Sequence, residues 1–228
     1  MIKFYYSLAP NPMKVALLLE ELALPYEAIP VDTRKGDQFA PDYAALNHNN
    51  KVPCIVDGEA VVFDSNAILL YLAEKTGKFL AADTPAARGE MLSWLMFVAT
   101  GIGPYSGQAV HFRHFAPEPK DYALTRYAFE AERHWGIINE RLAKHHYMLG
   151  DDYTIVDMDV WGWARMVPFV TGDDNIWSKL PHVKRLLDEV SARPAAMRAT
   201  AIKDRHTFKT EMDEAARQNM FRHLAKAG

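Results

Sequence analysis

Residues 49–72 read NNKVPCIVDGEAVVFDSNAILLYL, a stretch that predicts a β-hairpin followed by a helix. Asp57-Gly58 separates two apolar runs, and glycine readily takes the positive φ that a tight hairpin turn requires. Asp64 and Ser65 stand just before a helical apolar pattern and are residue types that begin helices. Pro53 has no N–H for a sheet, so we expect it at the start of the first strand.

The same stretch contains two features that favour ligand binding. A proline at a strand entry leaves the backbone groups of Val52 available to pair with an extended ligand. Ser65 at a helix N-terminus offers a hydroxyl, N–H groups and the positive end of the helix dipole to a carboxylate. Each feature alone also occurs where it serves only to begin a strand or a helix. Together they suit a short peptide that is held at its middle and at one charged end.

The chain before this stretch predicts a strand, a helix and a second strand. Residues 1–8 are rich in aromatic and branched side chains, which is typical of a strand. Asn11 is the expected helix cap, with Pro12 at the first helical position. Apolar residues then recur at helical spacing over residues 15–22, and residues 26–31 follow as a strand. A β-α-β crossover followed by a hairpin and a helix is the arrangement of the thioredoxin fold.

The chain after Gly77 changes character and becomes almost entirely helical in pattern. Residues 80–88 have no periodic pattern and are expected to be a linker. Further on, Thr154 and Asp157 form a capping box, with Asp157 in place of the usual glutamate. Trp161 and Trp163 are expected in the core behind it. Helices are expected over residues 88–97, 122–142 and 180–192.

The predicted fold is therefore an α/β N-terminal thioredoxin-like domain plus an all-α C-terminal domain. We expect the first domain over residues 1–79 and the second over residues 87–228.

Composition points to a soluble cytoplasmic protein. The formal charge of −3 provides no basic field for nucleic acid, and no apolar run approaches the roughly 20 residues that span a bilayer. Cys54 is the single cysteine, which excludes an intrachain disulfide and fits a reducing compartment. It lies in an apolar strand, where a buried and unreactive thiol is expected.

The whole chain resembles the soluble glutathione transferase family, in particular its bacterial nu class. The shared elements are Val52-Pro53, Asp64-Ser65, Pro10-Asn11, the KGDQF and NNKVP segments at residues 35–39 and 49–53, and residues 107–114. Nu-class members are noted for glutathione-dependent disulfide reduction. The resemblance implies glutathione as co-substrate, a cis bond before Pro53 and a backbone contact from Val52 to the cysteinyl residue. It also implies that Asp64 receives the γ-glutamyl ammonium and Ser65 its carboxylate.

The resemblance further implies that Gln38 and Lys51 hold the glycine end of glutathione. It implies that Arg126 reaches the glutathione of a partner subunit, which predicts a homodimer. Tyr105, His111 and His114 are expected to line or cover the cleft for the second substrate. Because no cysteine or HExxH pattern accompanies these histidines, we expect no metal site.

The donor to the glutathione sulfur has several candidates. By residue type they are Tyr5, Tyr6 and Ser7, and by nu-class position the candidate is Asn11. Helix capping is an equally good explanation of Asn11, and one of the two tyrosines must face the core because strand side chains alternate. The class usually has threonine where this chain has Ala9, which removes one hydroxyl from around the thiolate and leaves room for Ser7.

The leading hypothesis is a glutathione transferase-like enzyme that presents the glutathione thiolate to a disulfide or a small electrophile. One alternative is a binding module of the same fold without catalysis. This alternative is retained because Ala9 removes one hydroxyl from around the thiolate. Another is a glutathione-dependent isomerase or lyase. The sequence does not specify the second substrate.

Overall fold

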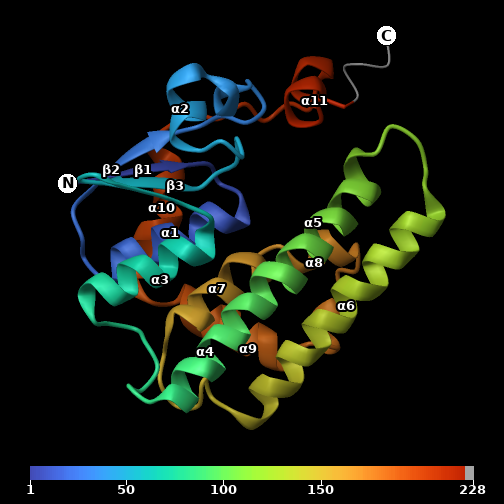
Figure 1. Ribbon diagram of the computed structural model, residues 1–228. Coiled ribbons are helices and arrows are strands. Elements are labelled where there is room, and N and C mark those ends of the chain that lie inside the picture. Colours follow the sequence, from blue (N-terminus) through green and yellow to red (C-terminus); the bar gives the residue numbers. More distant parts are fainter. Residues whose placement is uncertain (224–228) are drawn as a thin grey trace. The chain divides into compact units, whose positions relative to one another are not determined.

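The computed structural model describes residues 1–223, and their contacts divide the chain into two compact units. Of the described residues, the first unit comprises Met1–Tyr71 together with residues 195–223, and the second comprises Leu72–Pro194. Figure 1 shows the order of the helices and strands along the chain.

The first unit contains a four-stranded mixed sheet with strand order β2-β1-β3-β4. Strands β1 and β2 pair in parallel, whereas β1–β3 and β3–β4 pair antiparallel. Gly58, with φ of 63°, lies in the turn that joins β3 to β4, as the Asp-Gly signal predicts. The strands are β1 (Ile2–Tyr6), β2 (Tyr26–Pro30), β3 (Cys54–Asp57) and β4 (Ala60–Phe63). This topology confirms the predicted thioredoxin-like arrangement.

Helices cover both faces of this sheet, with α1 and α3 on one side and α2 on the other (Figure 1). Along β1 the side chains alternate: Phe4 and Tyr6 are fully buried, whereas Tyr5 points to the opposite face and packs near Tyr43. The helices are α1 (Pro10–Glu21), α2 (Pro41–Leu46), α3 (Ser65–Thr76), α10 (Pro194–Ala201) and α11 (Glu214–Met220), with short 3₁₀ turns η1 (Asp37–Phe39) and η5 (Ile202–Asp204). Helices α3 and α10 each extend across the boundary between the units.

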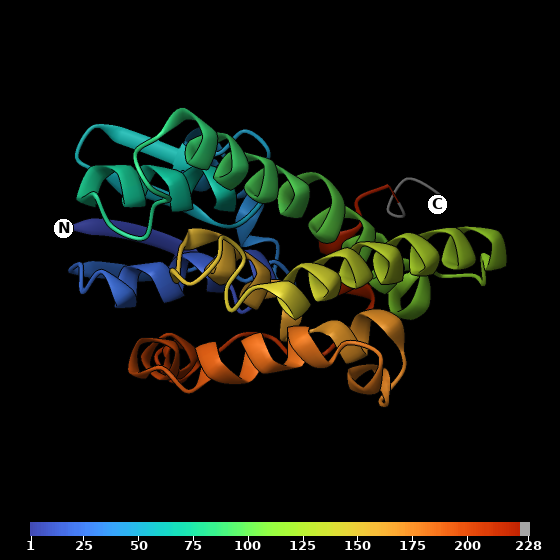
Figure 2. The ribbon, with the colours of Figure 1, turned by 90° about the horizontal axis from the view of Figure 1, so that it is seen from below.

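The second unit is helical throughout its regular elements, as the sequence predicts. Helix α6 contacts both α5 and α9, and Figure 2 shows these helices from below. The helices are α4 (Pro85–Phe97), α5 (Gly103–Val110), α6 (Asp121–Lys144), α7 (Ile155–Ala164), α8 (Val167–Thr171) and α9 (Pro181–Ser191). Single turns of π-helix, η2 (Val98–Ile102) and η3 (His111–Phe115), flank α5, and η4 (Ile176–Ser178) is a 3₁₀ turn.

Helix α7 is the buried centre of this unit, and every residue from Ile155 to Ala164 is buried. Trp161 and Trp163 are 1% and 9% exposed, which confirms their predicted place in the core. The predicted capping box is also present. The Thr154 side chain accepts a hydrogen bond from a backbone N–H of the first helical turn, and Asp157 Oδ2 accepts from the Thr154 N–H at 2.8 Å.

The domain division differs from the predicted one at the C-terminal end. The sequence predicts a second domain over residues 87–228, but residues 195–223 pack with the first unit, and residues 224–228 lie outside the described part of the chain. Arg198 Nε donates to Glu20 Oε2 of α1 at 2.7 Å, and Tyr6 Oη of β1 donates to the Ile202 oxygen at 3.2 Å. These contacts join residues far apart in the sequence, so the local pattern contains no sign of them.

Candidate glutathione site

The loop before Pro53 is held by side chains of α2 and of the turn that follows it. Tyr43 Oη and Asn47 Nδ2 both donate to the Lys51 oxygen, at 2.5 and 2.7 Å. The Val52–Pro53 peptide bond is cis, and β3 begins one residue later. Within residues 1–223, the backbone N–H and C=O of Val52 form no hydrogen bond with another backbone group. These two hydrogen bonds hold the main chain before Pro53 in place, and the backbone of Val52 can pair with an extended ligand.

Asp64, the residue just before α3, has a left-handed backbone conformation. Asp64 has φ of 73°, and its Oδ1 accepts from the N–H groups of Asn66 and Ala67 at 2.9 and 3.3 Å. Asp64 thus caps the helix while its side chain stays exposed. Ser65 is 4% exposed and its hydroxyl donates to Asn66 Oδ1 at 3.2 Å.

Lys14 is a further polar residue at this helix start, and the sequence motifs do not single it out. Its ammonium lies 3.5 Å from Ser65 Oγ and 3.4 Å from Asn66 Oδ1, although the residue is only 1% exposed. A buried cation beside the N-terminus of α3 adds to the helix dipole, and both favour a bound carboxylate. The available sign was a lysine inside the apolar stretch of α1, where a charge is rare unless it has a partner.

Helix α1 begins two residues earlier than predicted. Ala9 is the N-cap in an extended conformation, and Pro10 rather than Pro12 is the first helical residue. The prediction that Asn11 caps α1 is therefore wrong, because Asn11 lies inside the first turn. Pro10 and Pro12 have no N–H, so Asn11 has the only backbone donor among the first three helix positions.

Ser7 lies at the start of this turn and is 8% exposed. Its Oγ accepts from the Ala9 N–H at 3.4 Å. Ser7 therefore orders the chain that leads into α1, and its hydroxyl hydrogen is still able to donate.

The two tyrosines of β1 have other environments. Tyr6 is fully buried, and its hydroxyl lies between the Ile202 oxygen and His206 Nδ1. Tyr5 points to the sheet face that carries α2, where burial raises the pKa of its hydroxyl. Cys54 lies on β3, is fully buried as predicted, and burial raises the pKa of its thiol to about 11. A thiol with that pKa is almost wholly protonated near neutral pH.

The residues expected at the glycine end differ in exposure. Lys51 is exposed next to Val52, as a cation that binds a carboxylate would be. Gln38 is 4% exposed, and its Nε2 donates to the oxygens of Thr33 and Asn219 at 3.3 and 3.1 Å.

The remaining predicted site residues belong to the second unit. Arg126 donates to Glu130 Oε1 at 2.6 Å, one turn along α6, and this hydrogen bond raises the pKa of the guanidinium. Its side chain is half exposed, so the ion pair adds little to stability. Tyr105 lies near Tyr127 and His134, with ring centroids 6.3 and 4.9 Å away.

The two histidines of the π-turn η3 have different neighbours. His111 packs edge-on against Phe112 at 5.1 Å. His114 stacks on Phe169 at 3.9 Å, and its Nε2 lies 2.9 Å from the Phe169 oxygen. Across residues 1–223, no group of three or more His, Cys, Asp or Glu side chains is placed to hold a metal ion.

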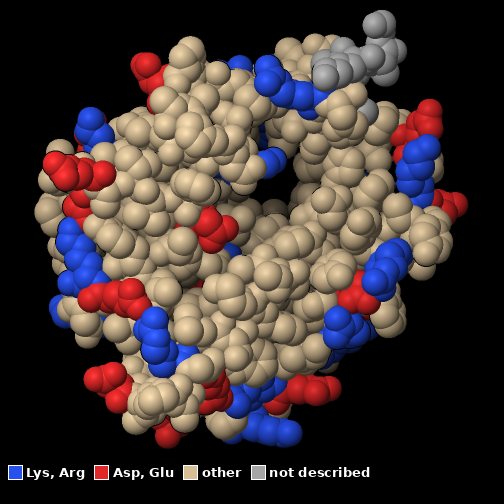
Figure 3. Space-filling model, in the orientation of Figure 1, with Lys and Arg blue, Asp and Glu red and all other residues tan. Residues whose placement is uncertain are grey.

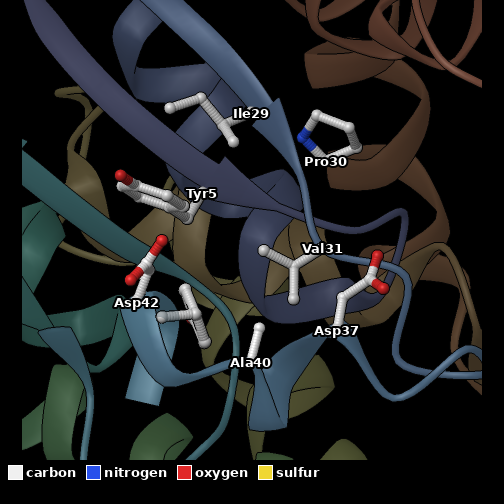
Figure 4. Close-up of a pocket in the computed structure, with 8 residues that line it drawn as sticks. Tyr5, Ile29, Pro30, Val31, Asp37, Ala40 and Asp42 are labelled. Carbon is white, nitrogen blue, oxygen red and sulfur yellow. The ribbon is translucent and has the colours of Figure 1, made fainter. Parts of the chain in front are cut away.

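A small cavity of about 230 Å³ lies between the sheet and α2, and Figure 4 shows its walls. Its lining includes Tyr5, Val31 and the carboxylates of Asp37 and Asp42. Of the residues predicted to contact glutathione, Tyr5, a candidate sulfur donor by residue type, lines this cavity and the others do not.

The surface carries charges of both signs, which are interspersed over the face shown in Figure 3. The formal charge of the whole chain is −3. Among the helices of residues 1–223, none combines the length and the apolar character that crossing a membrane requires.

Two family models match the chain. The N-terminal domain of glutathione S-transferase matches residues 2–74, and the C-terminal domain of glutathione S-transferase matches residues 104–194. The chain belongs to the glutathione S-transferase family, which confirms the resemblance seen in the sequence.

Individual relatives are similar over most of the chain. One is the disulfide-bond oxidoreductase YfcG of Escherichia coli K12, 39% identical over 213 residues that cover 87% of this chain and 94% of the relative. A glutathione transferase family member from Pseudomonas fluorescens pf-5, solved with two glutathione molecules bound, has a TM-score of 0.82 and 38% identity and covers 87% of this chain and 91% of its own. A glutathione transferase from Pseudomonas putida, solved with one glutathione disulfide per subunit, has a TM-score of 0.83 and 34% identity over 89% of this chain and 91% of its own.

Proposed function

We propose that this chain is a glutathione-dependent enzyme that reduces disulfides. The observation that carries the proposal is the state of Cys54, which is the only cysteine, is buried, and has a pKa raised to about 11. Because the protein offers no reactive thiol of its own, every reacting sulfur must come from the ligands. The similarity to a protein named as a disulfide-bond oxidoreductase, and to structures that hold two glutathiones or glutathione disulfide, supports this class of reaction.

The reaction consumes two glutathione molecules. The thiolate of the first attacks one sulfur of the substrate disulfide, forms a mixed disulfide and releases one substrate thiolate. The thiolate of the second attacks the glutathione sulfur of that mixed disulfide and releases the second substrate thiolate. The products are glutathione disulfide and two thiols, whose protons come from the two glutathione thiols. Conjugation to an electrophile would use only the first thiolate.

The protein's own residues hold the first glutathione and favour its thiolate. We propose that Val52 pairs with the cysteinyl backbone, that Asp64 takes the γ-glutamyl ammonium, and that Ser65, with Lys14 beside it, takes the carboxylate. The sulfur then accepts from Asn11, whose side-chain amide and backbone N–H both belong to the first turn of α1. Donors at a helix N-terminus stabilise an anion, and this lowers the pKa of the bound thiol.

The experiment measures reduction of 2-hydroxyethyl disulfide by glutathione, with glutathione disulfide as the quantified product. Asn11→Ala is expected to lower turnover by on the order of 10²-fold while changing glutathione affinity less than about threefold, because donors to a developing anion act mainly on the chemical step. Cys54→Ala is the control and is expected to retain activity, because its sulfur takes no part.

Four results would contradict the proposal or one of its parts. Full activity of Asn11→Ala would remove Asn11 from the mechanism, and loss of activity in a folded Cys54→Ala variant would show that a protein thiol reacts. Glutathione consumed by an electrophile but not by any disulfide would replace disulfide reduction by conjugation. Glutathione binding without turnover would favour the non-catalytic module.

We also propose that the enzyme acts as a homodimer in a reducing, cytoplasmic compartment, with Arg126 reaching the glutathione of the other subunit. Arg133 provides a matched control, because it also pairs with Glu130, at 2.8 Å, and is similarly exposed. Arg126→Ala is expected to weaken glutathione binding about tenfold and Arg133→Ala less than twofold. Light scattering that shows a monomer would reject the shared site.

A further inference from the structure

The turn at residues 32–37 and the C-terminal segment, residues 206–222, are joined by a set of hydrogen bonds within the first unit. Asp32 Oδ2 accepts from the Lys209 N–H at 2.7 Å, and Arg34 Nη1 donates to the Lys209 oxygen at 2.8 Å. Further along, Asn219 Nδ2 donates to the Arg34 oxygen at 3.0 Å. The C-terminal segment is therefore fixed to this turn at two places, one near Lys209 and one near Asn219.

The Asn219 anchor fits closely against the turn. Gly36 has φ of 89°, which the turn requires, and a Cβ at this position would lie 3.0 Å from Asn219 Oδ1. Arg222 lies over the ring of Phe39 at 3.9 Å from the centroid, on the other side of Gln38 in sequence. The segment thus passes directly over the residues that carry Gln38.

Gln38 is the residue that this contact covers. A side-chain amide has two N–H donors, and those of Gln38 are directed to the oxygens of Thr33 and Asn219. Because both partners are carbonyls, the nitrogen rather than the oxygen of the amide must face them. Gln38 Oε1 is buried and has no hydrogen-bond partner within residues 1–223.

In this arrangement the Asn219 oxygen and the glycyl carboxylate of a bound glutathione compete for the same N–H group of Gln38. If Gln38 donates to the glycyl carboxylate of glutathione, it must release one of its present acceptors. The Asn219 oxygen is the one supplied by the C-terminal segment, whereas Thr33 belongs to the same turn as Gln38. A carboxylate is the stronger acceptor, but the gain is reduced by the bond that is lost.

We propose that Asn219 determines specificity at the glycine end of the glutathione site. Through its main-chain oxygen the C-terminal segment competes for Gln38, and so it limits how strongly the site prefers glutathione over the dipeptide γ-glutamylcysteine, which has no glycine. This inference rests on the proposed function and on the role of Gln38 that the family resemblance implies, because it requires that the first unit binds glutathione with the glycyl carboxylate at Gln38. Coupling of this kind is reciprocal, so glutathione bound at Gln38 loosens the segment.

Calorimetric titration of the full chain with glutathione and with γ-glutamylcysteine tests the proposal. Asn219→Ala removes the anchor to Arg34 and is expected to tighten glutathione binding about two- to tenfold, the range of one net hydrogen bond, without changing dipeptide binding. Gln218→Ala is the matched control, because it is the neighbouring, exposed position on α11 and pairs with Glu214. It is expected to change neither affinity. In a Gln38→Ala background, Asn219→Ala is expected to bring no gain.

Several outcomes overturn the inference. An unchanged or weaker affinity of Asn219→Ala for glutathione would do so, as would an equal shift for both ligands. If the unaltered protein binds both ligands and Asn219→Ala does not change the ratio of their affinities, the inference alone fails. If it binds neither, the glutathione site itself is rejected together with the inference.

Hydrogen exchange on the unaltered chain gives a second measurement that needs no variant. Saturating glutathione is expected to speed amide exchange within residues 213–222, and γ-glutamylcysteine is expected to leave it unchanged. Slower or unchanged exchange with glutathione would contradict the competition.

Discussion

The N-termini of α3 and α7 are built from the same residue types and have different surroundings. At α7, Asp157 is fully buried, and its oxygens accept from the N–H groups of Met148 and Thr154 at 2.7 and 2.8 Å. At α3, Asp64 is exposed and caps the helix with one oxygen, while Ser65 lies beside the ammonium of Lys14. An acid and a hydroxyl at a helix start therefore do not by themselves indicate binding. At α7 both carboxylate oxygens are buried and accept protein N–H groups, whereas at α3 the capping carboxylate is exposed.

The largest expected effect is on stability, from Asp157→Ala. Removing the carboxylate leaves the buried N–H groups of Met148 and Thr154 without an acceptor, and each such loss costs about 1–3 kcal/mol. The free energy of unfolding is expected to fall by about 3–5 kcal/mol in urea denaturation. A loss below about 1 kcal/mol would show that water replaces the carboxylate as the acceptor, and it would remove the energetic contrast between α7 and α3.

The pH dependence of stability tests the same carboxylate. Burial, as the largest cause, raises the pKa of Asp157 from 3.8 to about 6, against the opposing effect of its hydrogen bonds. Between about pH 4 and pH 6 the folded state retains a proton that the unfolded state has released, so the free energy of unfolding falls as pH rises. This difference of about two units corresponds to on the order of 3 kcal/mol. Subtracting the profile of Asp157→Asn should leave a falling component in this window, and a flat difference would contradict burial as the dominant cause.

The smallest expected effects come from the paired hydroxyl variants Ser65→Ala and Thr154→Ala. Ser65→Ala is expected to weaken glutathione binding about tenfold, or about 1.4 kcal/mol, and to change stability by less than about 1 kcal/mol. Thr154→Ala is expected to cost about 1–2 kcal/mol of stability and to leave glutathione affinity unchanged. The comparison of the two helix starts fails if both variants affect the same quantity.

The elements that could be predicted are those whose causes are local. The capping box at Thr154 and Asp157 depends on a spacing of three residues, and the hairpin at Asp57-Gly58 depends on one dipeptide. The resemblance to the glutathione transferase family rests on short motifs of this kind, and the family models confirm it. The start of α1 was misplaced because Pro10 and Pro12 both suit the first turn of a helix, and the sequence alone does not choose between them.

The features that could not be predicted depend on contacts across long stretches of chain. Lys14 meets Ser65 and Asn66 over 51 and 52 positions, and Asn219 meets Gln38 over 181. A residue's type and spacing do not report such partners, because they arise only when separate elements pack. For this reason Gln38 could be assigned a ligand role from its motif, while its engagement by the C-terminal segment could not.

The hydroxyl of Tyr6 has a practical consequence for anyone who wishes to isolate the glutathione-binding half. Tyr6 is a fully buried aromatic residue of β1, and its hydroxyl donates to the Ile202 oxygen and meets His206, both near the far end of the chain. A fragment cut at residue 79 would keep the phenol and lose the groups that cover it, exposing an aromatic ring beside the sheet. A minimal version of this half must therefore carry the final stretch of the protein, either joined through a new linker or supplied as a second peptide.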